Sequence, residues 1–175
     1  MLKKIFKFSA LIALGLALVG FILMMATPAV AYLDDVKNYY SGTCAIFGKG
    51  TAQVAIGGYN ISGDFDGTLA WNALLAWIFV LLAMLILCAS FVLSILKVKI
   101  GEKIAGILDL VVIGLLLVGG VFMFFTVPAF FGANDWNGAN DWGLGAGWII
   151  GAILILVGGV FAALPVVANF MGKNK

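Results

Sequence analysis

Long apolar runs alternate with short polar segments along this chain, and the pattern predicts four membrane-spanning helices. The runs cover about residues 5–26, 69–96, 104–127 and 144–170. Each run has at least the roughly 20 residues that an α-helix needs to cross the hydrocarbon core of a bilayer. The expected fold is therefore all-α and integral to the membrane: an antiparallel bundle of four transmembrane helices in a single domain, 1–175.

The composition supports a lipid environment for these helices. Of the 175 residues, 64% are hydrophobic and 10% are charged, and the mean hydropathy is +1.18. Soluble domains are usually about half apolar and about a quarter charged. The surplus of apolar side chains cannot be hidden in a core of this size, so lipid must solvate it. The lipid bilayer is the first expected partner.

Lysines gather on one side of the predicted bundle and aspartates on the other. The N-terminus, the 97–103 connection and the C-terminus carry eight of the ten lysines, together with Glu102. The other two connections, about 33–68 and 128–143, carry six aspartates and two lysines. Because an excess of lysine marks cytoplasmic segments, we expect a multi-pass plasma-membrane protein with cytoplasmic termini and extracellular acidic loops.

The start of the chain has two interpretations. "MLKKIFK", an apolar stretch and "TPAVAY" together fit a secretory signal peptide cleaved after Ala31. The apolar stretch from Phe8 to Ala26 is longer than the usual signal core of about 7–15 residues, which favours a retained first helix. Cleavage would leave three helices, with the acidic loops still outside.

The first extracellular loop contains the pattern of a β-hairpin. In "TAQVAIGGYNIS", two short alternating segments flank Gly57 and Gly58. A glycine pair supplies the positive φ angles of a two-residue hairpin turn. We therefore expect a small extracellular β-hairpin cap over residues 51–62, and a short helix in the preceding "LDDVKNYYSG".

Small residues recur at helical spacing and predict close contacts between helices, because lipid tails compete with larger side chains for the same surfaces. One glycine in every four residues marks the last helix, at Gly143, Gly147 and Gly151. The segment "LVGGVF" occurs twice, at 117–122 and 156–161, and supplies Gly119 and Gly158. Two convergent packing sites are the simpler interpretation, and an inverted repeat that lines a transport path is the alternative.

Asp109 is the one charged residue well inside a predicted transmembrane run. Such a residue is by default a candidate ion or proton site. It lies six residues after Lys103, near the cytoplasmic end of its helix, where the helix dipole favours an anion. A lysine of the 97–103 connection could also reach it. An interfacial ion pair is therefore expected, with a transport site as the alternative.

A row of oxygen-bearing side chains precedes the second helix, at Asn60, Ser62, Asp64 and Asp66. Ligands at alternate positions followed by glycine resemble the start of a Ca²⁺-binding loop. The EF-hand pattern also needs a Glu further on, and the sequence has Ala73 there. A polar turn is the expected interpretation, calcium is the alternative, and no cofactor is expected.

The sequence contains neither His nor Arg, which narrows the chemistry. A His-based metal site or general base is excluded, and no Arg can clamp a phosphate. No basic patch interleaved with aromatic residues suggests nucleic-acid binding. Cys44 lies in an extracellular segment and Cys88 within a membrane run, so the two are too far apart for a disulfide. We expect neither an enzyme nor a nucleic-acid-binding protein.

The second extracellular loop repeats itself in "GANDWNGANDWG", residues 132–143. Its Asn-Asp and Gly pairs predict two successive turns. An interfacial aromatic belt is expected of Trp71, Trp77, Trp142 and Trp148. In the first copy of the repeat, Asn134, Asp135 and Trp136 have no such structural role. These three residues are the candidate contact with a partner protein or a sugar.

Four helices, cytoplasmic termini, a larger first extracellular loop with β character and a short second loop make the chain similar in plan to claudin-type tetraspan proteins. The paired cysteines and the Gly-Leu-Trp signature of that family are absent, since this loop has Cys44 alone. The resemblance therefore implies a topology, and no residue or activity is carried over.

The leading hypothesis is a non-catalytic tetraspan protein that acts as a scaffold, adhesion protein or complex subunit. Its extracellular loops would contact a protein partner or a second copy of the chain. The alternative is a small transporter, channel or accessory transport subunit that uses Asp109 and the paired "LVGGVF" segments.

Overall fold

The computed structural model describes residues 2–34, 37–56, 59–96 and 102–173, and it is mostly helical with one small sheet. Four helices are long and apolar enough to cross a membrane, which indicates a multi-pass membrane protein in a lipid environment. These helices are α1 (Leu2–Ala26), α3 (Trp71–Ile95), α4 (Glu102–Phe124) and α6 (Ala146–Lys173).

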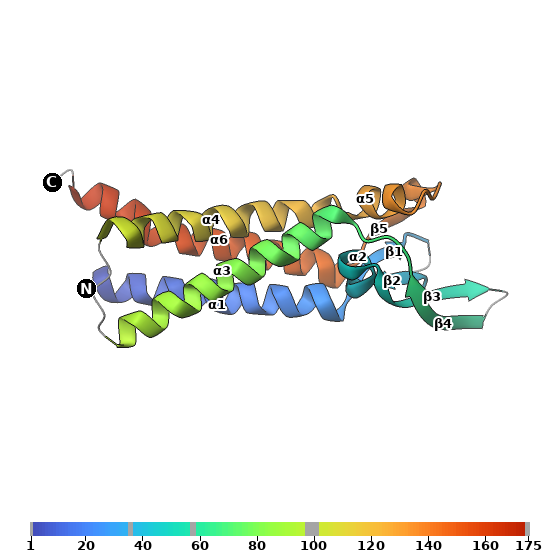
Figure 1. Cartoon of the computed structure of the whole chain (residues 1–175), viewed down its shortest axis with the longest axis horizontal. Coiled ribbons are helices and arrows are strands. Elements are labelled where there is room, and N and C mark those ends of the chain that lie inside the picture. Colours follow the sequence, from blue (N-terminus) through green and yellow to red (C-terminus); the bar gives the residue numbers. More distant parts are fainter. Residues whose placement is uncertain (1, 35–36, 57–58, 97–101, 174–175) are drawn as a thin grey trace.

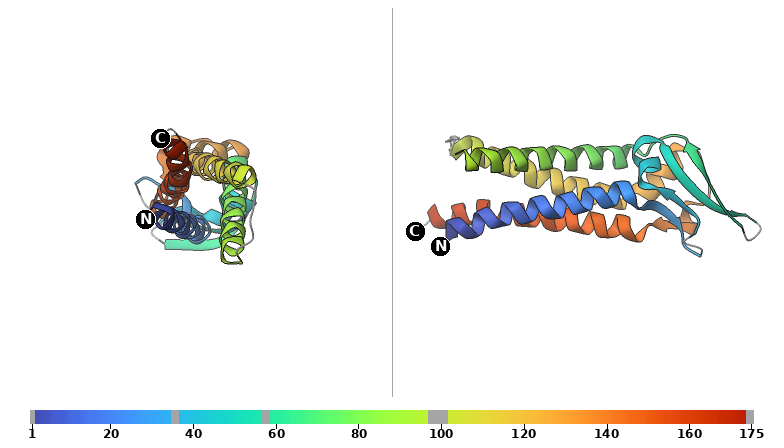
Figure 2. Two further views of the ribbon diagram at one scale, coloured as in Figure 1. Left: turned by 90° about the vertical axis from the view of Figure 1, so that its left-hand side faces the viewer. Right: turned by 90° about the horizontal axis from the view of Figure 1, so that it is seen from below.

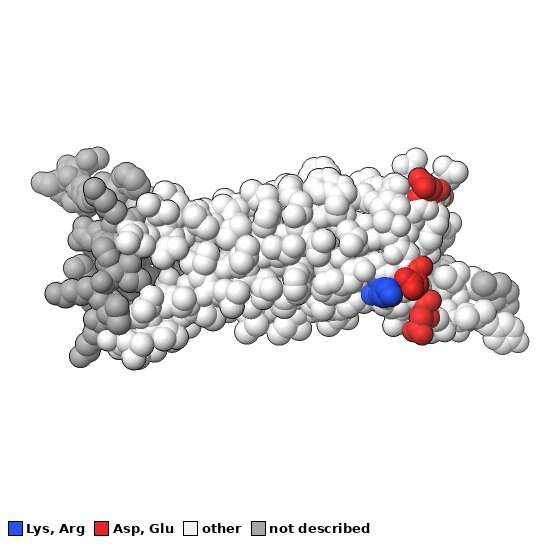
Figure 3. Space-filling view, viewed as in Figure 1, with Lys and Arg blue, Asp and Glu red and all other residues white. Residues whose placement is uncertain are grey.

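The four helices form an antiparallel bundle with both termini at the end opposite the sheet (Figure 1). Around the bundle, α1 packs against α6, α6 against α4, and α4 against α3, and the view along the bundle shows this square arrangement (Figure 2). The contact between α1 and α3 that closes the square is the least extensive of the four. Among the described residues on the face shown in Figure 3, the charged side chains lie at the sheet end, and none lies along the middle of the bundle.

A five-stranded antiparallel sheet, in the order β4-β3-β2-β1-β5, covers one end of the bundle. Its last strand comes from the connection between α4 and α6, so the sheet joins both connections at this end. The strands are β1 (Pro28–Tyr32), β2 (Tyr39–Ser41), β3 (Lys49–Ile56), β4 (Tyr59–Asp66) and β5 (Trp142–Leu144).

The predicted hairpin over residues 51–62 is confirmed and is longer than expected. Strands β3 and β4 pair without interruption from Lys49 opposite Asp66 to Ile56 opposite Tyr59. The predicted turn residues, 57–58, lie outside the described residues. The cap is therefore a sheet that contains the hairpin, and not the hairpin alone.

A short helix, α2 (Gly42–Phe47), follows β2 and lies between the sheet and the bundle. The helix predicted in "LDDVKNYYSG" is wrong, because the end of this segment is strand β2 and the helix begins at its last residue, Gly42. Only glycine fits at position 42, because the backbone of α1 passes close to it: a Cβ there would lie 1.7 Å from the backbone oxygen of Met24. Cys44 and Ile46 of α2 are fully buried, so α2 forms the core of the cap.

The third predicted helix ends earlier than expected, and the connection that follows is not a simple turn. Helix α4 ends at Phe124 instead of 127. It is followed by α5 (Thr126–Ala133), the 3₁₀ helix η1 (Ala139–Asp141) and then β5.

Side chains from two other helices stabilise this break. The Asn72 Nδ2 atom donates to the Phe122 oxygen at 2.9 Å, and the Trp148 Nε1 atom donates to the Met123 oxygen at 3.0 Å. Carbonyls at the end of a helix have no partner within the helix and need one elsewhere. Donors from α3 and α6 therefore allow α4 to end within an apolar stretch of sequence.

Candidate functional site

The first copy of the Gly-Ala-Asn-Asp-Trp repeat places Trp136 on a cluster of rings. Its ring centroid lies 5.4 Å from that of Tyr40 and 5.9 Å from those of Phe65, Phe130 and Phe131. Its side chain is 38% exposed. We call the six residues Tyr40, Phe65, Phe130, Phe131, Trp136 and Trp142 the aromatic cluster.

The second copy of the repeat brings Trp142 onto the same cluster. The Trp142 ring lies 5.4 Å from Tyr40 and 5.6 Å from Phe131, so the two tryptophans of the repeat contact the same two rings. Aromatic pairs at these separations each contribute about 0.5–1.5 kcal/mol beyond the burial of their area. The repeat therefore holds strand β2 and helix α5 together at two points.

Asn134 is a structural residue in this arrangement. Its Nδ2 atom donates to the Thr68 and Phe130 oxygens, each at 2.9 Å, and its Oδ1 atom accepts the Thr68 N–H at 2.8 Å. It thus ends α5 and ties it to the segment between β4 and α3. Asp135 is exposed, with a φ of 54°. The expectation that the first copy has no structural role is wrong, whereas partner binding by Asn134, Asp135 and Trp136 stays a prediction.

The four candidate calcium ligands lie in a strand. Asn60, Ser62, Asp64 and Asp66 occupy alternate positions of β4, and all are exposed. Alternate side chains of a strand are roughly 6.6–7 Å apart, whereas oxygens bind Ca²⁺ at about 2.3–2.6 Å. The strand therefore does not bring the four side chains to one point. Among the described residues, no group of three His, Cys, Asp or Glu residues could hold a metal ion.

Each residue on one face of the β3–β4 hairpin is polar or small. Directly paired residues of an antiparallel hairpin lie on the same face, and successive pairs alternate between faces. The pairs Thr51–Asp64, Gln53–Ser62 and Ala55–Asn60 share this face with Lys49–Asp66. The Lys49 Nζ atom lies 3.6 Å from an oxygen of Asp66, and both side chains are exposed.

The opposite face of the hairpin is apolar and is only partly covered. At its base, Phe65 packs in the aromatic cluster against Tyr40 and Phe130. Further out on the same face, Val54 pairs with Ile61, and Tyr59 belongs to the last described pair. These three side chains, which we call the apolar strip, are 38%, 53% and 78% exposed in the order Val54, Ile61 and Tyr59.

The apolar strip is visible in the sequence only as the alternation that predicts the hairpin, and it was not predicted as a site. The described hairpin extends past the end of the helices (Figures 1 and 2). Nothing in the spacing of apolar residues shows where the supporting surface ends.

Asp109 lies in α4 and lines a cavity of about 260 Å³. The carboxyl group is half-buried, and within the described part of the chain it makes no ion pair. The predicted partners are the lysines of the 97–103 connection; Lys97 and Lys99 lie outside the described residues, and so does the side chain of Lys103. The predicted interfacial ion pair is therefore not tested.

The predicted packing glycines make close contacts between helices. A Cβ at Gly151 would lie 3.2 Å from the Gly20 oxygen, and one at Gly158 would lie 3.3 Å from the Ala13 oxygen, so both face α1. Close backbone approach of this kind is what membrane helices gain from glycine. Gly147 faces Thr27, and Gly119 faces Val80 of α3.

Gly143 does not belong to this helix-packing set. It lies in strand β5, where it pairs with Ala31 of β1. Helix α6 begins only at Ala146, because the backbone before it is recruited into the sheet. The last predicted helix therefore begins two residues later than expected.

The two "LVGGVF" segments pack on each other reciprocally. A Cβ at Gly120 would lie 2.7 Å from Cγ of Leu156, and a Cβ at Gly159 would lie 3.0 Å from a methyl group of Leu117. The leucine of each copy thus packs against the second glycine of the other. This contact supports the packing interpretation of the repeat.

The expected aromatic belt is wrong for Trp148. This side chain is fully buried and donates to the Met123 oxygen, as described above. Trp142 belongs to the aromatic cluster, and Trp77 packs against Phe21 and Phe47. Only Trp71 of the four is largely exposed.

Cys44 and Cys88 are both free, as expected. Cys44 is fully buried, with its Sγ atom 3.1 Å from Ser41 Oγ and 3.4 Å from the Thr51 oxygen, to which it donates. Burial raises the pKa of the Cys44 thiol above its usual range, which disfavours the thiolate, the reactive form. This cysteine is therefore a structural residue of the cap.

No family model and no curated protein matches this chain.

Proposed function

We propose that this protein is a non-catalytic, multi-pass protein of the plasma membrane that binds a protein partner through its extracellular cap. In this proposal the sheet end is extracellular and both termini are cytoplasmic, because α3 and α6 end, and α1 and α4 begin, at the end opposite the sheet, next to the lysine-rich segments of the sequence. The cap would serve as a scaffold or adhesion surface, or as a subunit contact in a complex.

The observation that carries the proposal is the apolar strip. Val54, Tyr59 and Ile61 lie on one face of a hairpin that extends beyond the bundle. In the proposed orientation this part of the hairpin is outside the membrane, so a protein partner and not lipid would cover these side chains. Fully burying a large apolar side chain contributes about 1.5–3 kcal/mol. Contiguous apolar surface of this kind marks interaction sites.

The base of the hairpin is anchored well enough to present such a surface. Phe65 packs in the aromatic cluster, and the Gly67 N–H donates to the Gly48 oxygen at 2.9 Å. The Thr68 backbone is held on both sides by Asn134. A partner would therefore meet a preorganised strand pair and not a loop that must first be ordered.

Site-specific photo-crosslinking in native membranes tests the proposal. A photoreactive residue at Ile61, on the apolar strip, should crosslink a partner, and one at Ser62, on the polar face, serves as the matched control. A product of twice the chain mass identifies a second copy as the partner. Equal yields from both faces, or no product from Ile61, would contradict the proposal.

A second test uses the two adjacent cross-strand pairs. The double variant Val54→Ser, Ile61→Ser should abolish co-purification of the partner in mild detergent. The double variant Gln53→Ser, Ser62→Ala changes the polar face and should retain it. Retention by both variants would show that the strip is not the contact.

The alternative function is that of a small transporter, channel or accessory transport subunit, and Asp109 is the observation that favours it. The "LVGGVF" segments support it less, because the leucine of each copy occupies the space beside the second glycine of the other copy and leaves no path there. Solute flux in liposomes containing the purified protein, abolished by Asp109→Asn, would establish transport in place of the proposed function.

A further inference from the structure

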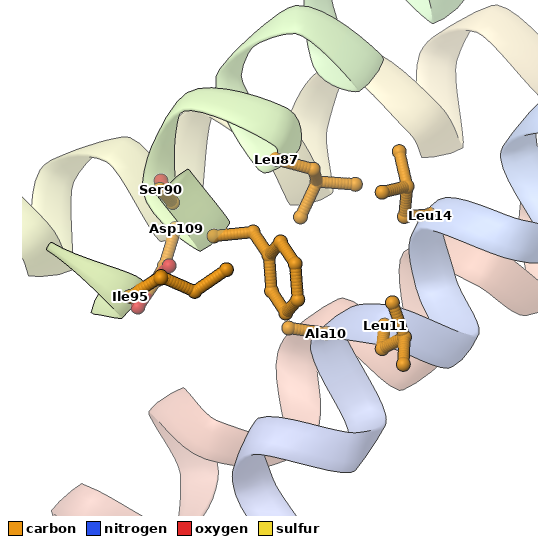
Figure 4. A pocket seen from close by; sticks show the side chains of 8 residues that line it. Ala10, Leu11, Leu14, Leu87, Ser90, Ile95 and Asp109 are labelled. Atoms are coloured by element: carbon orange, nitrogen blue, oxygen red, sulfur yellow. The ribbon is translucent and has the colours of Figure 1, made fainter. Parts of the chain in front are cut away.

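A cavity opens where the bundle is loosest. It has a volume of about 260 Å³ and lies between α1 and α3, with Asp109 of α4 in its wall (Figure 4). The α1–α3 contact is the least extensive around the bundle, so these helices leave space that the other pairs fill. The cavity lies toward the end opposite the sheet, since Asp109 is five residues from the first residue of the α4 span, Ile104.

The lining of the cavity is apolar except at one end. Figure 4 shows Ser90 and Asp109 together on one side and Leu14 on the other, with Leu87 between. At about 1.5 Å per residue, Asp109 is roughly 7–8 Å inside its predicted span, which begins at Ile104. Helix α3 ends at Ile95, and Leu87 is farther from that end than Ser90, so the apolar side of the cavity is the deeper one.

Part of the lining of this cavity is exposed on the side of the bundle. Leu11, Phe91 and Ile95, which also line it, are exposed on the surface of the bundle. That surface belongs to helices long and apolar enough to lie in a bilayer. A ligand would therefore enter from the hydrocarbon layer and not from water.

We propose that this cavity binds a single-chain amphiphile whose head group carries a protonated amine. A carboxylate near the membrane interior requires a cation or hydrogen-bond donors to offset its desolvation, and an ammonium group supplies both. The Ser90 hydroxyl can accept a further N–H, and the hydrocarbon chain lies along Leu14 and Leu87. The cavity is smaller than the roughly 300–1,000 Å³ of pockets for drug-sized ligands, which favours one chain over two.

The charge of the lining selects the amine over other heads. Asp109 is the only charged residue among the described residues that line the cavity, so a phosphate or carboxylate head would meet a like charge. A neutral alcohol could hydrogen-bond there but would leave the carboxylate without a counter-ion. A lysine of this chain is the competing occupant of the site, and the experiment distinguishes the two.

The test measures binding of dodecylamine, dodecanol and dodecanoate to the purified full-length protein in nanodiscs, by their shift of the thermal unfolding midpoint. Dodecylamine should bind at least about tenfold more tightly than dodecanol, which corresponds to one charge-assisted contact. Dodecanoate should bind most weakly. Equal binding of amine and alcohol by the wild type would overturn the proposal.

Three variants assign the effect to the cavity. Asp109→Asn, which keeps the shape of the side chain, should make amine and alcohol bind equally, whereas Asp135→Asn at the other end should keep the preference for the amine. Ala10→Phe fills the cavity and should weaken both ligands at least tenfold, which keeps the proposal testable if Asp109→Asn does not fold. An unchanged preference in Asp109→Asn would overturn the proposal, because the preference would then not come from this carboxylate. A lysine of the chain that already pairs with Asp109 would instead make amine and alcohol bind equally in the wild type, which overturns it too.

Discussion

The Asn134 side chain connects two separate segments of the cap. Its three hydrogen bonds join the end of α5 to both backbone groups of Thr68, 66 residues away in the sequence. The same position in the second copy of the repeat, Asn140, is exposed. The two copies are thus identical in sequence and different in environment.

We expect Asn134→Ala to lower the free energy of unfolding by about 1–2 kcal/mol, because each net hydrogen bond contributes about 0.5–1.5 kcal/mol and the site is partly solvated. Asn140→Ala is the matched control and should change it by less than about 0.5 kcal/mol. Thermal or denaturant unfolding in detergent measures both. Equal effects of the two variants would show that the Thr68 contacts do not stabilise the fold.

A pH dependence is expected from the buried groups of the cap. Burial raises the pKa of Tyr40, with a further contribution from the nearby Cys44, and burial raises the pKa of Cys44. Between the unfolded and folded pKa values the unfolded chain has already lost its proton, so stability falls as pH rises above about 9. Tyr40→Phe and Cys44→Ala should each reduce this fall, measured as unfolding midpoints from pH 7 to 11. An unchanged profile in both variants would contradict the assignment.

At the residue scale, the sequence showed which side chains cannot form a bond with each other better than it showed which side chains do. It indicated that Cys44 and Cys88 cannot pair, because a disulfide needs proximity that the topology denies. It assigned Trp148 to the lipid interface, whereas the indole donates to a carbonyl of α4. The hydropathy pattern does not reveal this hydrogen bond. The Met123 carbonyl needs a donor only because α4 ends at Phe124, and the pattern does not show that end.

At the scale of elements, the reciprocal fit of the two "LVGGVF" segments explains why the glycines come in pairs. The second glycine of each copy, Gly120 or Gly159, receives a leucine of the other copy. The first glycine of each copy contacts a different neighbouring helix: Gly119 contacts α3, and Gly158 contacts α1. Each pair therefore packs one helix against two neighbours at the same depth.

We expect Gly120→Ala to destabilise the bundle by about 1–3 kcal/mol, because the added methyl group overlaps Leu156. Gly114→Ala in the same helix meets nothing within 4 Å and should be neutral, or stabilising by up to about 1 kcal/mol. Unfolding in mixed micelles measures the difference.

A double-mutant cycle provides the control for this contact. Leu156→Ala removes the atoms that the new methyl group would meet, so the double variant with Gly120→Ala should be more stable than the two single effects predict. Strict additivity would show that the strain lies elsewhere.

The long helices and the β3–β4 hairpin were predictable and the other short elements were not, for one physical reason. An apolar run of about 20 residues determines a transmembrane helix by itself, and the β3–β4 hairpin follows from two alternating segments that are close together in the sequence. Strand β5 exists because β1 is beside it, and α5 begins where Asn72 and Trp148 supply donors to α4. Elements that depend on distant partners leave little trace in local periodicity.

At the scale of the molecule, α1 and the cap depend on each other. Cleavage after Ala31 would remove α1 and most of β1, which pairs with both β2 and β5. It would also expose the face of α6 at Gly151 and Gly158, which now contacts α1. We therefore expect the mature chain to keep α1.

Intact-mass measurement of the protein purified from membranes checks this expectation. The wild-type mass should include residues before Ala31, apart from removal of the initiator Met. The variant Ala29→Leu, which removes the small residue that a signal peptidase needs, should give the same N-terminus. A wild-type chain that begins at residue 32, restored to full length by Ala29→Leu, would refute it.

The last prediction concerns the orientation of the whole molecule. With the sheet end outside, a thiol placed at Ser62, which is exposed on the hairpin, should react with a membrane-impermeant maleimide on intact cells. A thiol at Lys175 should react only after permeabilisation. The background variant is Cys88→Ser, and Cys44 can remain because it is fully buried. Labelling of the Lys175→Cys chain, and not the Ser62→Cys chain, on intact cells would invert the topology and place the apolar strip in the cytoplasm, where its partner would then have to be sought.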